Sequence, residues 1–130
     1  MVGGLVVKVL VVEDSSFARM AVTKVVGGLL PNAEFFEAAD GKTGLALFQT
    51  MRPDLVLTDL LMPTMTGEDL IRSIRQLDAT VPIIVMTANI QKPAREKVEA
   101  LGVTGFVTKP VIGESIKTLR ALLTGCLHAE

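Results

Sequence analysis

Polar side chains stand at the points where four hydrophobic runs of the sequence end. They are Glu13-Asp14, Asp59, Thr87 and Lys109. A carboxylate can act as a nucleophile, while an ammonium group and a hydroxyl can bind and neutralise charge on a reacting group. Phosphoryl transfer needs this combination, because the oxygens of the transferred group are negatively charged and the nucleophile must be positioned. The residue types therefore favour phosphoryl chemistry, provided that the fold brings them together.

The carboxylates of Glu13, Asp14 and Asp59 also indicate a site for a divalent cation. Carboxylates that lie close together repel one another, and protonation of one group or binding of a cation relieves the repulsion. A site built from oxygen ligands, without histidine or cysteine, suits Mg²⁺. The only histidine, His128, lies at the far end of the sequence. A zinc site or a histidine-dependent triad is therefore not expected.

Each of these residues also has an ordinary structural interpretation. Asp14 alone could cap a helix, and Asp59 alone is more often a turn or cap residue than a nucleophile. Thr87 alone would be a strand residue, and Lys109 alone a solvated surface lysine. Compatible groups at four separate strand ends are difficult to assign to chance, so the combined pattern favours a functional site.

Short aliphatic and β-branched runs predict the strands that must position these groups. They lie at 5–12, 33–38, 55–59, 83–86 and 106–108. The run 55–59 has no polar interruption before its last two residues, as expected for the centre of a parallel sheet covered on both faces. In open α/β sheets, ligands bind beyond the carboxyl ends of the strands, which is where Asp59 is expected to lie.

Apolar residues at helical spacing fill the segments between these runs and predict five helices. The expected buried faces include Leu70, Ile71, Ile74 and Leu77 in one helix and Ile112, Ile116, Leu119 and Leu123 in the last. The first helix is expected to stop at about Gly27-Gly28, and the fourth at Gly102. Regular alternation of strands and helices predicts a doubly wound α/β fold with a parallel sheet.

Size and composition bound the class of protein. The 130 residues suit a single domain, 1–130, with its core at about 5–126. The formal net charge of −1, without a basic stripe, gives no reason to expect direct binding of nucleic acid. The single Cys126 fits a reducing compartment, and the N-terminal apolar run is too short for a membrane span. We therefore expect a soluble, cytoplasmic protein that does not bind membranes and is a monomer.

The full set of motif residues resembles the receiver domain of response regulators, particularly the single-domain CheY-like type. The resemblance covers nearly the whole chain and is carried by Glu13-Asp14, Asp59, Met62-Pro63, Gly67, Thr87-Ala88 and Lys109-Pro110. It implies a flavodoxin-like fold with strand order 2-1-3-4-5, which is the order known for CheY.

The resemblance also implies a role for each residue of the site. Asp59 would accept a phosphoryl group from a sensor histidine kinase or a histidine phosphotransfer protein. Asp14 and Asp59 would bind Mg²⁺ directly, with the carbonyl of Leu61 as a third ligand and Glu13 acting through water. Lys109 would pair first with Asp59 and then with the phosphoryl oxygens.

In the same family, the change at the acceptor is passed to a surface formed by helix four, strand five and helix five. Thr87 would bond a phosphoryl oxygen and couple to Phe106, where the frequent tyrosine hydroxyl is missing. Pro110 would follow a cis peptide bond. Leu61 and Asn89 would flank the path of the water that removes the phosphoryl group. The responding surface is expected to include Phe106 with Arg95, Glu99 and Lys117.

The main interpretation is thus a switch that signals through an output protein and catalyses only its own phosphorylation and dephosphorylation. The chain could also be a receiver excised from a larger hybrid kinase or regulator. A Mg²⁺-dependent aspartyl phosphatase is less favoured, because that class carries a second acid where this chain has Leu61. A nucleotide or flavin module is also less favoured. No G-x-G occurs, and Gly41-Lys42-Thr43 lacks the first glycine of a P-loop, whose position is held by Phe36.

Overall fold

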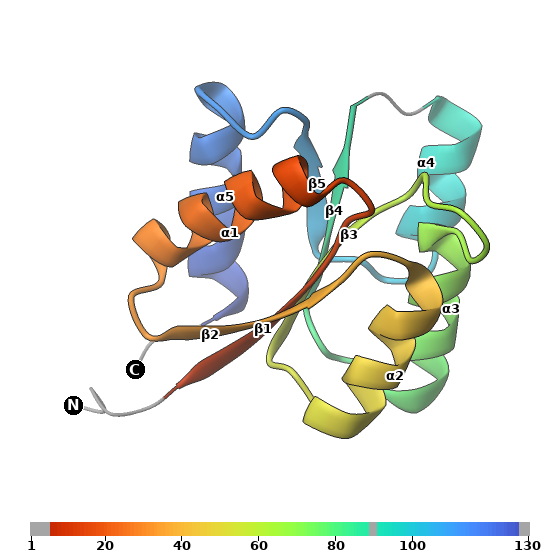
Figure 1. The fold of residues 1–130 in the computed structure, drawn as a ribbon. Coiled ribbons are helices and arrows are strands. Elements are labelled where there is room, and N and C mark those ends of the chain that lie inside the picture. The colour runs from red at the N-terminus through yellow and green to blue at the C-terminus, as the bar shows by residue number, and fades with distance from the viewer. Residues whose placement is uncertain (1–5, 89–90, 128–130) are drawn as a thin grey trace.

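The computed structural model describes residues 6–88 and 91–127. Within these residues, five parallel strands form a single sheet in the order β2-β1-β3-β4-β5 (Figure 1). The strands are β1 (Val7–Val12), β2 (Ala33–Ala38), β3 (Leu55–Asp59), β4 (Ile83–Thr87) and β5 (Gly105–Thr108). This confirms the predicted doubly wound α/β fold and its flavodoxin-like strand order.

Five helices of the described chain alternate with the strands and cover both faces of the sheet. They are α1 (Ser16–Leu29), α2 (Gly41–Met51), α3 (Gly67–Leu77), α4 (Lys92–Glu99) and α5 (Glu114–Cys126). Figure 1 shows α1 and α5 on one face and α2, α3 and α4 on the other. None of the helices among the described residues is long and apolar enough to cross a membrane.

Alternate residues of the central strands pack into two separate hydrophobic cores, one on each face of the sheet. In β1, Leu10 and Val12 pack in the core beneath α2, α3 and α4, which we call the α2–α4 core. Val9 and Val11 pack in the core beneath α1 and α5, the α1/α5 core. Every residue of β3 and β4 is buried, as expected for strands covered on both faces. The carboxyl ends of these rigid strands are therefore firmly placed.

Side-chain caps begin three of the helices within the described chain. Ser15 Oγ accepts from the Ala18 amide at 3.2 Å, and Thr66 Oγ1 accepts from the Asp69 amide at 3.1 Å. Asp40 caps α2 in the same way. Such caps satisfy amides that have no partner within the helix. The caps of α1 and α3 also mark where the chain leaves the β1 and β3 ends of the sheet.

Two helix ends differ from the prediction. Helix α1 includes Gly27 and Gly28 and ends at Leu29, one residue beyond the predicted stop. Helical glycine costs only about 1 kcal/mol relative to alanine, and packing of the flanking apolar residues on the α1/α5 core offsets that cost. Helix α4 ends at Glu99, before Gly102, which adopts a φ of 81° in the following turn.

Two residues assigned to buried helix faces are exposed. Leu77 is 43% exposed at the last position of α3, and Ile112 is 66% exposed. Helix α5 begins only at Glu114, so Ile112 lies in the preceding loop and does not follow the helical period. The remaining predicted face residues of these two helices pack in the cores, either fully or partly buried.

Candidate functional site

The register of β1 against β3 brings the acidic residues together. Val12 lies beside Thr58, so Glu13, directly after β1, comes next to Asp59, the last residue of β3. Glu13 is 1% exposed and Asp59 is 6% exposed. Two carboxylates at the ends of neighbouring strands are thus buried at one edge of the sheet.

The ends of β4 and β5 complete this edge. Thr87 lies beside Thr108, and Lys109 follows directly. The Lys109 amide donates to the Thr87 carbonyl at 2.9 Å, which extends the pairing of the two strands by one residue. The sheet therefore brings all the predicted strand-end groups to the same edge.

Lys109 joins the two buried carboxylates. Its Nζ donates to Glu13 Oε1 at 2.7 Å and to Asp59 Oδ2 at 2.8 Å. Burial by itself would lower the pKa of Lys109, but its hydrogen bonds to Asp59 and Glu13 and their charges outweigh burial and raise that pKa above its ordinary value. Lys109 is therefore a firmly held cation.

Backbone amides hold the other oxygen of Asp59. Oδ1 accepts from the Leu60 amide at 2.7 Å and more weakly from the Leu61 amide at 3.4 Å. The loop then folds back so that the Gly67 amide donates to the Leu60 carbonyl at 2.9 Å. A Cβ on Gly67 would collide with the Asp59 carbonyl, so only glycine permits this close return of the chain.

Glu13 is anchored at every polar atom. Its carboxylate accepts from Lys109 and, through Oε2, from the Ser15 amide at 3.0 Å. Its own amide donates to the Ala38 carbonyl at 3.0 Å. Its carbonyl accepts from Arg19 Nη1 at 2.6 Å. No pattern in the sequence indicates Arg19, since the contact depends on how α1 lies against the β1 end.

The acidic cluster fits a hard divalent cation. One carboxylate oxygen each from Glu13, Asp14 and Asp59 lies within 4.8 Å of the other two, and Asp14 is exposed to solvent. Among the described residues, the cluster offers three carboxylates, and Lys109 pairs with two of them, Glu13 and Asp59. This donor set matches the preference of Mg²⁺ for one or two carboxylates completed by carbonyl and water. The role predicted for the Leu61 carbonyl remains a prediction.

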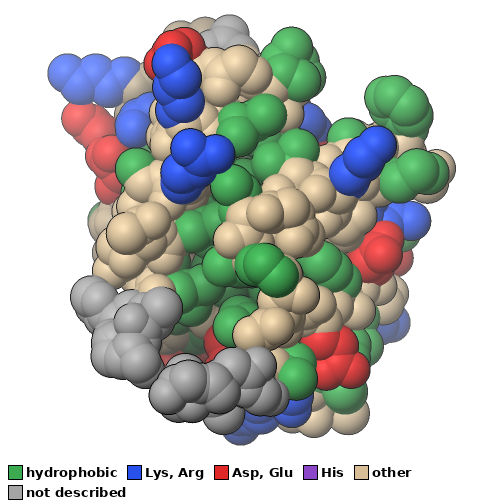
Figure 2. Space-filling view, turned by 90° about the vertical axis from the view of Figure 1, so that its left-hand side faces the viewer, with side chains coloured by type: hydrophobic (Ala, Val, Ile, Leu, Met, Phe, Trp, Pro, Cys, Tyr) green, Lys and Arg blue, Asp and Glu red, His purple; other side chains and the backbone are tan. Residues whose placement is uncertain are grey.

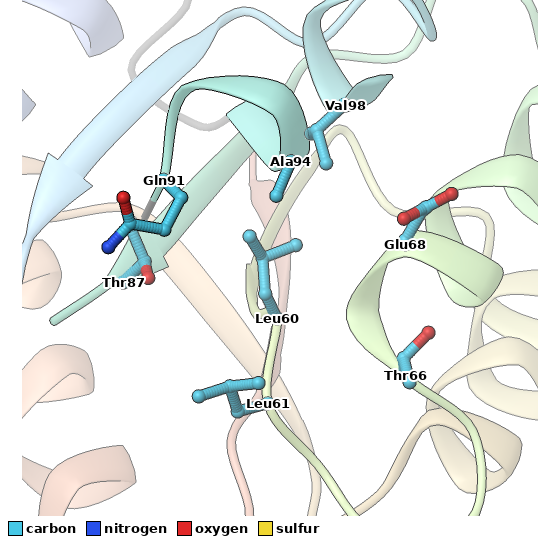
Figure 3. A pocket seen from close by; sticks show the side chains of 8 residues that line it. All are labelled: Leu60, Leu61, Thr66, Glu68, Thr87, Gln91, Ala94 and Val98. Atoms are coloured by element: carbon cyan, nitrogen blue, oxygen red, sulfur yellow. The ribbon is translucent and has the colours of Figure 1, made fainter. Parts of the chain in front are cut away.

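A hollow of about 250 Å³ lies next to the end of β3, between the β3–α3 loop and α4. Figure 3 shows Thr87 and Gln91 next to each other, and Leu60 pointing toward Ala94 and Val98 of α4. Thr87 is 6% exposed at the end of β4. At this edge of the sheet, Thr87 lines the hollow together with Gln91, the residue before α4.

The predicted responding surface contains a contact between α4 and β5. The Arg95 guanidinium carbon lies 4.2 Å from the centre of the Phe106 ring. Phe106 is half-buried against the α2–α4 core, and Arg95 also pairs with Glu99. Lys117, on α5, is exposed and pairs with Glu114. These residues are placed on neighbouring elements, but their part in signalling remains a prediction.

The sequence also led us to expect a cis peptide bond before Pro110 and a role for Asn89. The Lys109–Pro110 peptide bond is cis. Asn89 lies outside the described residues, so its predicted place beside the acceptor has no structural description.

Exposed apolar residues on the α1 side were missed by the sequence reasoning. Phe17 is 80% exposed and Met20 is 64% exposed, and Ile112 lies in the loop before α5. Phe17 lines a hollow of about 340 Å³ together with Lys109 and Pro110. Figure 2 views the α1 and α5 side of the molecule and shows hydrophobic side chains at the surface in the middle of this face. The sequence contains a sign of this surface, because Phe17 and Met20 are spaced at i and i+3 and so lie on one side of α1. That side is turned away from the buried Val22 and Val26.

Comparisons with known proteins agree with this geometry. Residues 9–121 match the family model of the response regulator receiver domain. The chain is 38% identical over 112 residues to a protein-glutamate methylesterase/protein-glutamine glutaminase of Koribacter versatilis, covering 85% of the chain but 31% of the relative. It is 34% identical over 118 residues to Protein CcdB of Bacillus subtilis, covering 88% of the chain and 93% of that protein.

The chain thus spans only about a third of the methylesterase relative. Among solved structures, the chemotaxis response regulator CheY4 of Vibrio cholerae superposes with a TM-score of 0.80 at 32% identity. The superposition covers 92% of this chain and 100% of that one. With its fold, its acidic edge and the family match in agreement, the chain belongs to the response regulator receiver domains of two-component signalling.

Proposed function

We propose that this chain is a phosphoacceptor switch whose acceptor is Asp59. The observation that carries the proposal is the position of Lys109 Nζ, 2.8 Å from Asp59 and 2.7 Å from Glu13, beside a cluster of three carboxylates. A buried carboxylate held between an ammonium group and a candidate cation site is suited to attack a phosphoryl group.

In the proposed reaction, an oxygen of Asp59 attacks the phosphorus of a phosphohistidine on a kinase or histidine phosphotransfer protein. The P–N bond breaks, its electron pair returns to the imidazole, and an acyl phosphate forms on Asp59. Lys109 passes from the carboxylate to the phosphoryl oxygens. Thr87, at the end of the neighbouring strand, donates its hydroxyl to one of these oxygens.

Mg²⁺, when bound, would neutralise charge on the phosphoryl oxygens. Asp14 and Asp59 would hold it directly, the Leu61 carbonyl would be a third ligand, and Glu13 would act through water. The cluster of oxygens within 4.8 Å supports this assignment for the three side chains. Because the carboxylates are already gathered, binding the cation requires little rearrangement of the buried pair.

The proposed output is a change in the surface of α4, β5 and α5, which a downstream protein reads in the cytoplasm. The Arg95–Phe106 contact supports a coupled α4–β5 surface. Similarity to CheY4 along that protein's whole length favours a chemotaxis-type or phosphorelay role. In this proposal the chain turns over no external substrate, and it acts in the same way alone or as part of a larger regulator.

The proposal is tested by intact mass after incubation with phosphoramidate, a small donor that contains the P–N bond. The wild type and Asp59→Asn are compared in Mg²⁺ and in chelator, and released phosphate is measured in parallel. Asp69→Asn is the matched control, because Asp69 is an exposed acid in the first turn of α3. We expect one phosphoryl group to be added to the wild type and the control, only with Mg²⁺, and none to Asp59→Asn.

Absence of both an adduct and Asp59-dependent phosphate release would contradict the proposal. Released phosphate without an adduct would instead identify a short-lived acyl phosphate. Sustained hydrolysis of p-nitrophenyl phosphate would favour the aspartyl phosphatase. Leu61, which occupies the position of that class's second acid, makes this outcome unexpected.

A further inference from the structure

The peptide between Glu13 and Asp14 is held by a side chain from α1. The carbonyl oxygen of Glu13 accepts a hydrogen bond of 2.6 Å from Arg19 Nη1. A peptide unit is planar, so fixing its oxygen also fixes the direction in which the next residue begins. That next residue is Asp14, which supplies the exposed carboxylate of the acidic cluster.

Arg19 is itself oriented by a second contact. Its Nε donates to Glu37 Oε1 at 3.0 Å, so a different part of the guanidinium points to the Glu13 carbonyl. Arg19 is 19% exposed, whereas Glu37 is 47% exposed. The planar guanidinium can make both bonds in a fixed geometry, which the single ammonium of lysine cannot reproduce.

The charge of Arg19 would not by itself help a cation to bind nearby. Its ion pair with Glu37 offsets that charge, and the bond to Glu13 is made to a neutral carbonyl. The contribution of Arg19 to the cluster is therefore geometric. The rest of Glu13 is anchored independently by Lys109 and by the Ser15 amide. The Arg19 bond is the one of these contacts that is made to the peptide unit joining Glu13 to Asp14.

We propose that Arg19 is a positioning residue that sets the orientation of Asp14 for cation binding. The inference rests on the proposed function, because it assigns Asp14 to the cation site. Arg19 touches neither the cation nor the phosphoryl group. It acts as an outer support, and loss of such supports typically weakens metal binding about 10- to 100-fold.

The test measures binding of Mn²⁺ to the unphosphorylated chain, by loss of the electron paramagnetic resonance signal of the free ion, with Mg²⁺ as competitor. Mn²⁺ takes the same oxygen ligands as Mg²⁺. The variants are Arg19→Gln, Arg19→Lys and Glu37→Gln. Arg120→Gln, an exposed arginine on α5, is the matched control.

We expect Arg19→Gln and Arg19→Lys to raise the Mn²⁺ dissociation constant by about 10-fold. Glu37→Gln, which keeps an acceptor for Arg19, is expected to change it by less than about threefold, and Arg120→Gln to leave it unchanged. Phosphorylation by phosphoramidate should slow in the Arg19 variants at low Mg²⁺ and return to the wild-type rate at saturating Mg²⁺.

Wild-type Mn²⁺ affinity in both Arg19 variants would overturn the inference and leave Arg19 as a link between α1 and β2. Wild-type affinity in Arg19→Lys alone would also overturn it, because charge would then suffice. A rate that stays low at saturating Mg²⁺ would indicate a general folding defect and contradict a positioning role. If Arg19→Gln does not fold in chelator, Arg19→Lys carries the test. Failure of the wild type to bind Mn²⁺ would overturn the proposed function as well.

Discussion

The carboxylate of Asp59 is held in place on both sides, so in the proposed reaction it is oriented before the phosphoryl group arrives. Its Oδ2 accepts from Lys109 and its Oδ1 accepts from the amides of Leu60 and Leu61. Because both oxygens are engaged, the carboxylate loses little further freedom when it reacts. The side chain of Leu61, two residues after Asp59, has no such hydrogen-bonding role. The Leu61 side chain is 78% exposed and apolar, so it can neither donate to nor accept from a water molecule near the acceptor.

We predict that Leu61→Asn changes the rate at which phosphorylated protein loses its phosphoryl group, because an amide can orient a water molecule. The side chain is exposed, so the free energy of unfolding should change by less than about 0.5 kcal/mol. Decay of the phosphorylated mass after removal of the donor, at matched Mg²⁺, gives the rate. Ile112→Asn, at another exposed aliphatic residue, is the control. Equal decay rates in all three proteins would contradict the prediction.

The β3–α3 loop is the element that joins Asp59 to α3. It leaves β3 at Asp59 and returns so closely that Gly67, the first residue of α3, lies against the backbone of Asp59 and Leu60. The Thr66 cap fixes the start of the helix at the same place. The position of the strand tip is therefore coupled to the packing of α3, whose buried residues belong to the α2–α4 core.

Gly67→Ala is expected to destabilise the protein and impair phosphorylation. The added Cβ would lie 2.6 Å from the Leu60 Cα, and backbone cannot move aside as a flexible side chain can. Overpacking of this kind costs about 1–3 kcal/mol. Urea unfolding measures the change in stability, and the phosphoramidate assay measures how much phosphoryl group is added to the protein. Gly28→Ala, in α1 with open space around the new Cβ, should instead stabilise by about 0.5–1 kcal/mol. A Gly67→Ala protein as stable as the wild type would refute the close approach.

At the scale of the whole molecule, Lys109 ties together three strands at the functional edge. Its ammonium group follows β5 and contacts Glu13 after β1 and Asp59 at the end of β3. These contacts connect residues separated by 96 and 50 positions in the sequence. The stability of the sheet edge should therefore depend on the charge of one lysine.

Burial lowers the pKa of Lys109 in the folded state, but the contacts with Asp59 and Glu13 raise it by more, so the net shift is upward. A raised lysine pKa gives stability that is complete below the unfolded pKa, about 10.4, and is lost as pH rises through the folded pKa. Lys109→Met should be less stable than the wild type by on the order of 3 kcal/mol at pH 7 in chelator, because two buried carboxylates lose their partner. Mg²⁺ should recover part of this loss.

Urea unfolding from pH 7 to 11 tests the sign of the effect. The difference between the wild type and Lys109→Met should shrink above about pH 10.4. Burial also raises the pKa of the Cys126 thiol, but this contribution occurs in both proteins and cancels in the difference. Lys117→Met removes an exposed lysine and should change stability by no more than about 1 kcal/mol. A difference that grows with pH would contradict the assignment.

Local sequence patterns were sufficient to predict the fold class and the strand-end residues. The hydrophobic periodicity of a strand or a helix depends only on residues close together in the sequence, as in the uninterrupted apolar run that forms β3. In a parallel sheet, the carboxyl ends of the strands share one edge, so Asp59 and Lys109 could be expected to meet. The expectation of Mg²⁺ came from the oxygen ligands that these strand ends carry. The expected partners came from resemblance, because no local pattern encodes them.

The tertiary structure decided the contacts that depend on register and on how each helix lies against the sheet. It placed Arg19 on the Glu13 carbonyl, carried α1 past Gly28 and left Ile112 exposed. Local propensity predicted the last two differently, because it omits the packing free energy that sets helix ends and rotation. Lys109 bridges two carboxylates only because β1, β3 and β5 are brought to one edge with their ends in step.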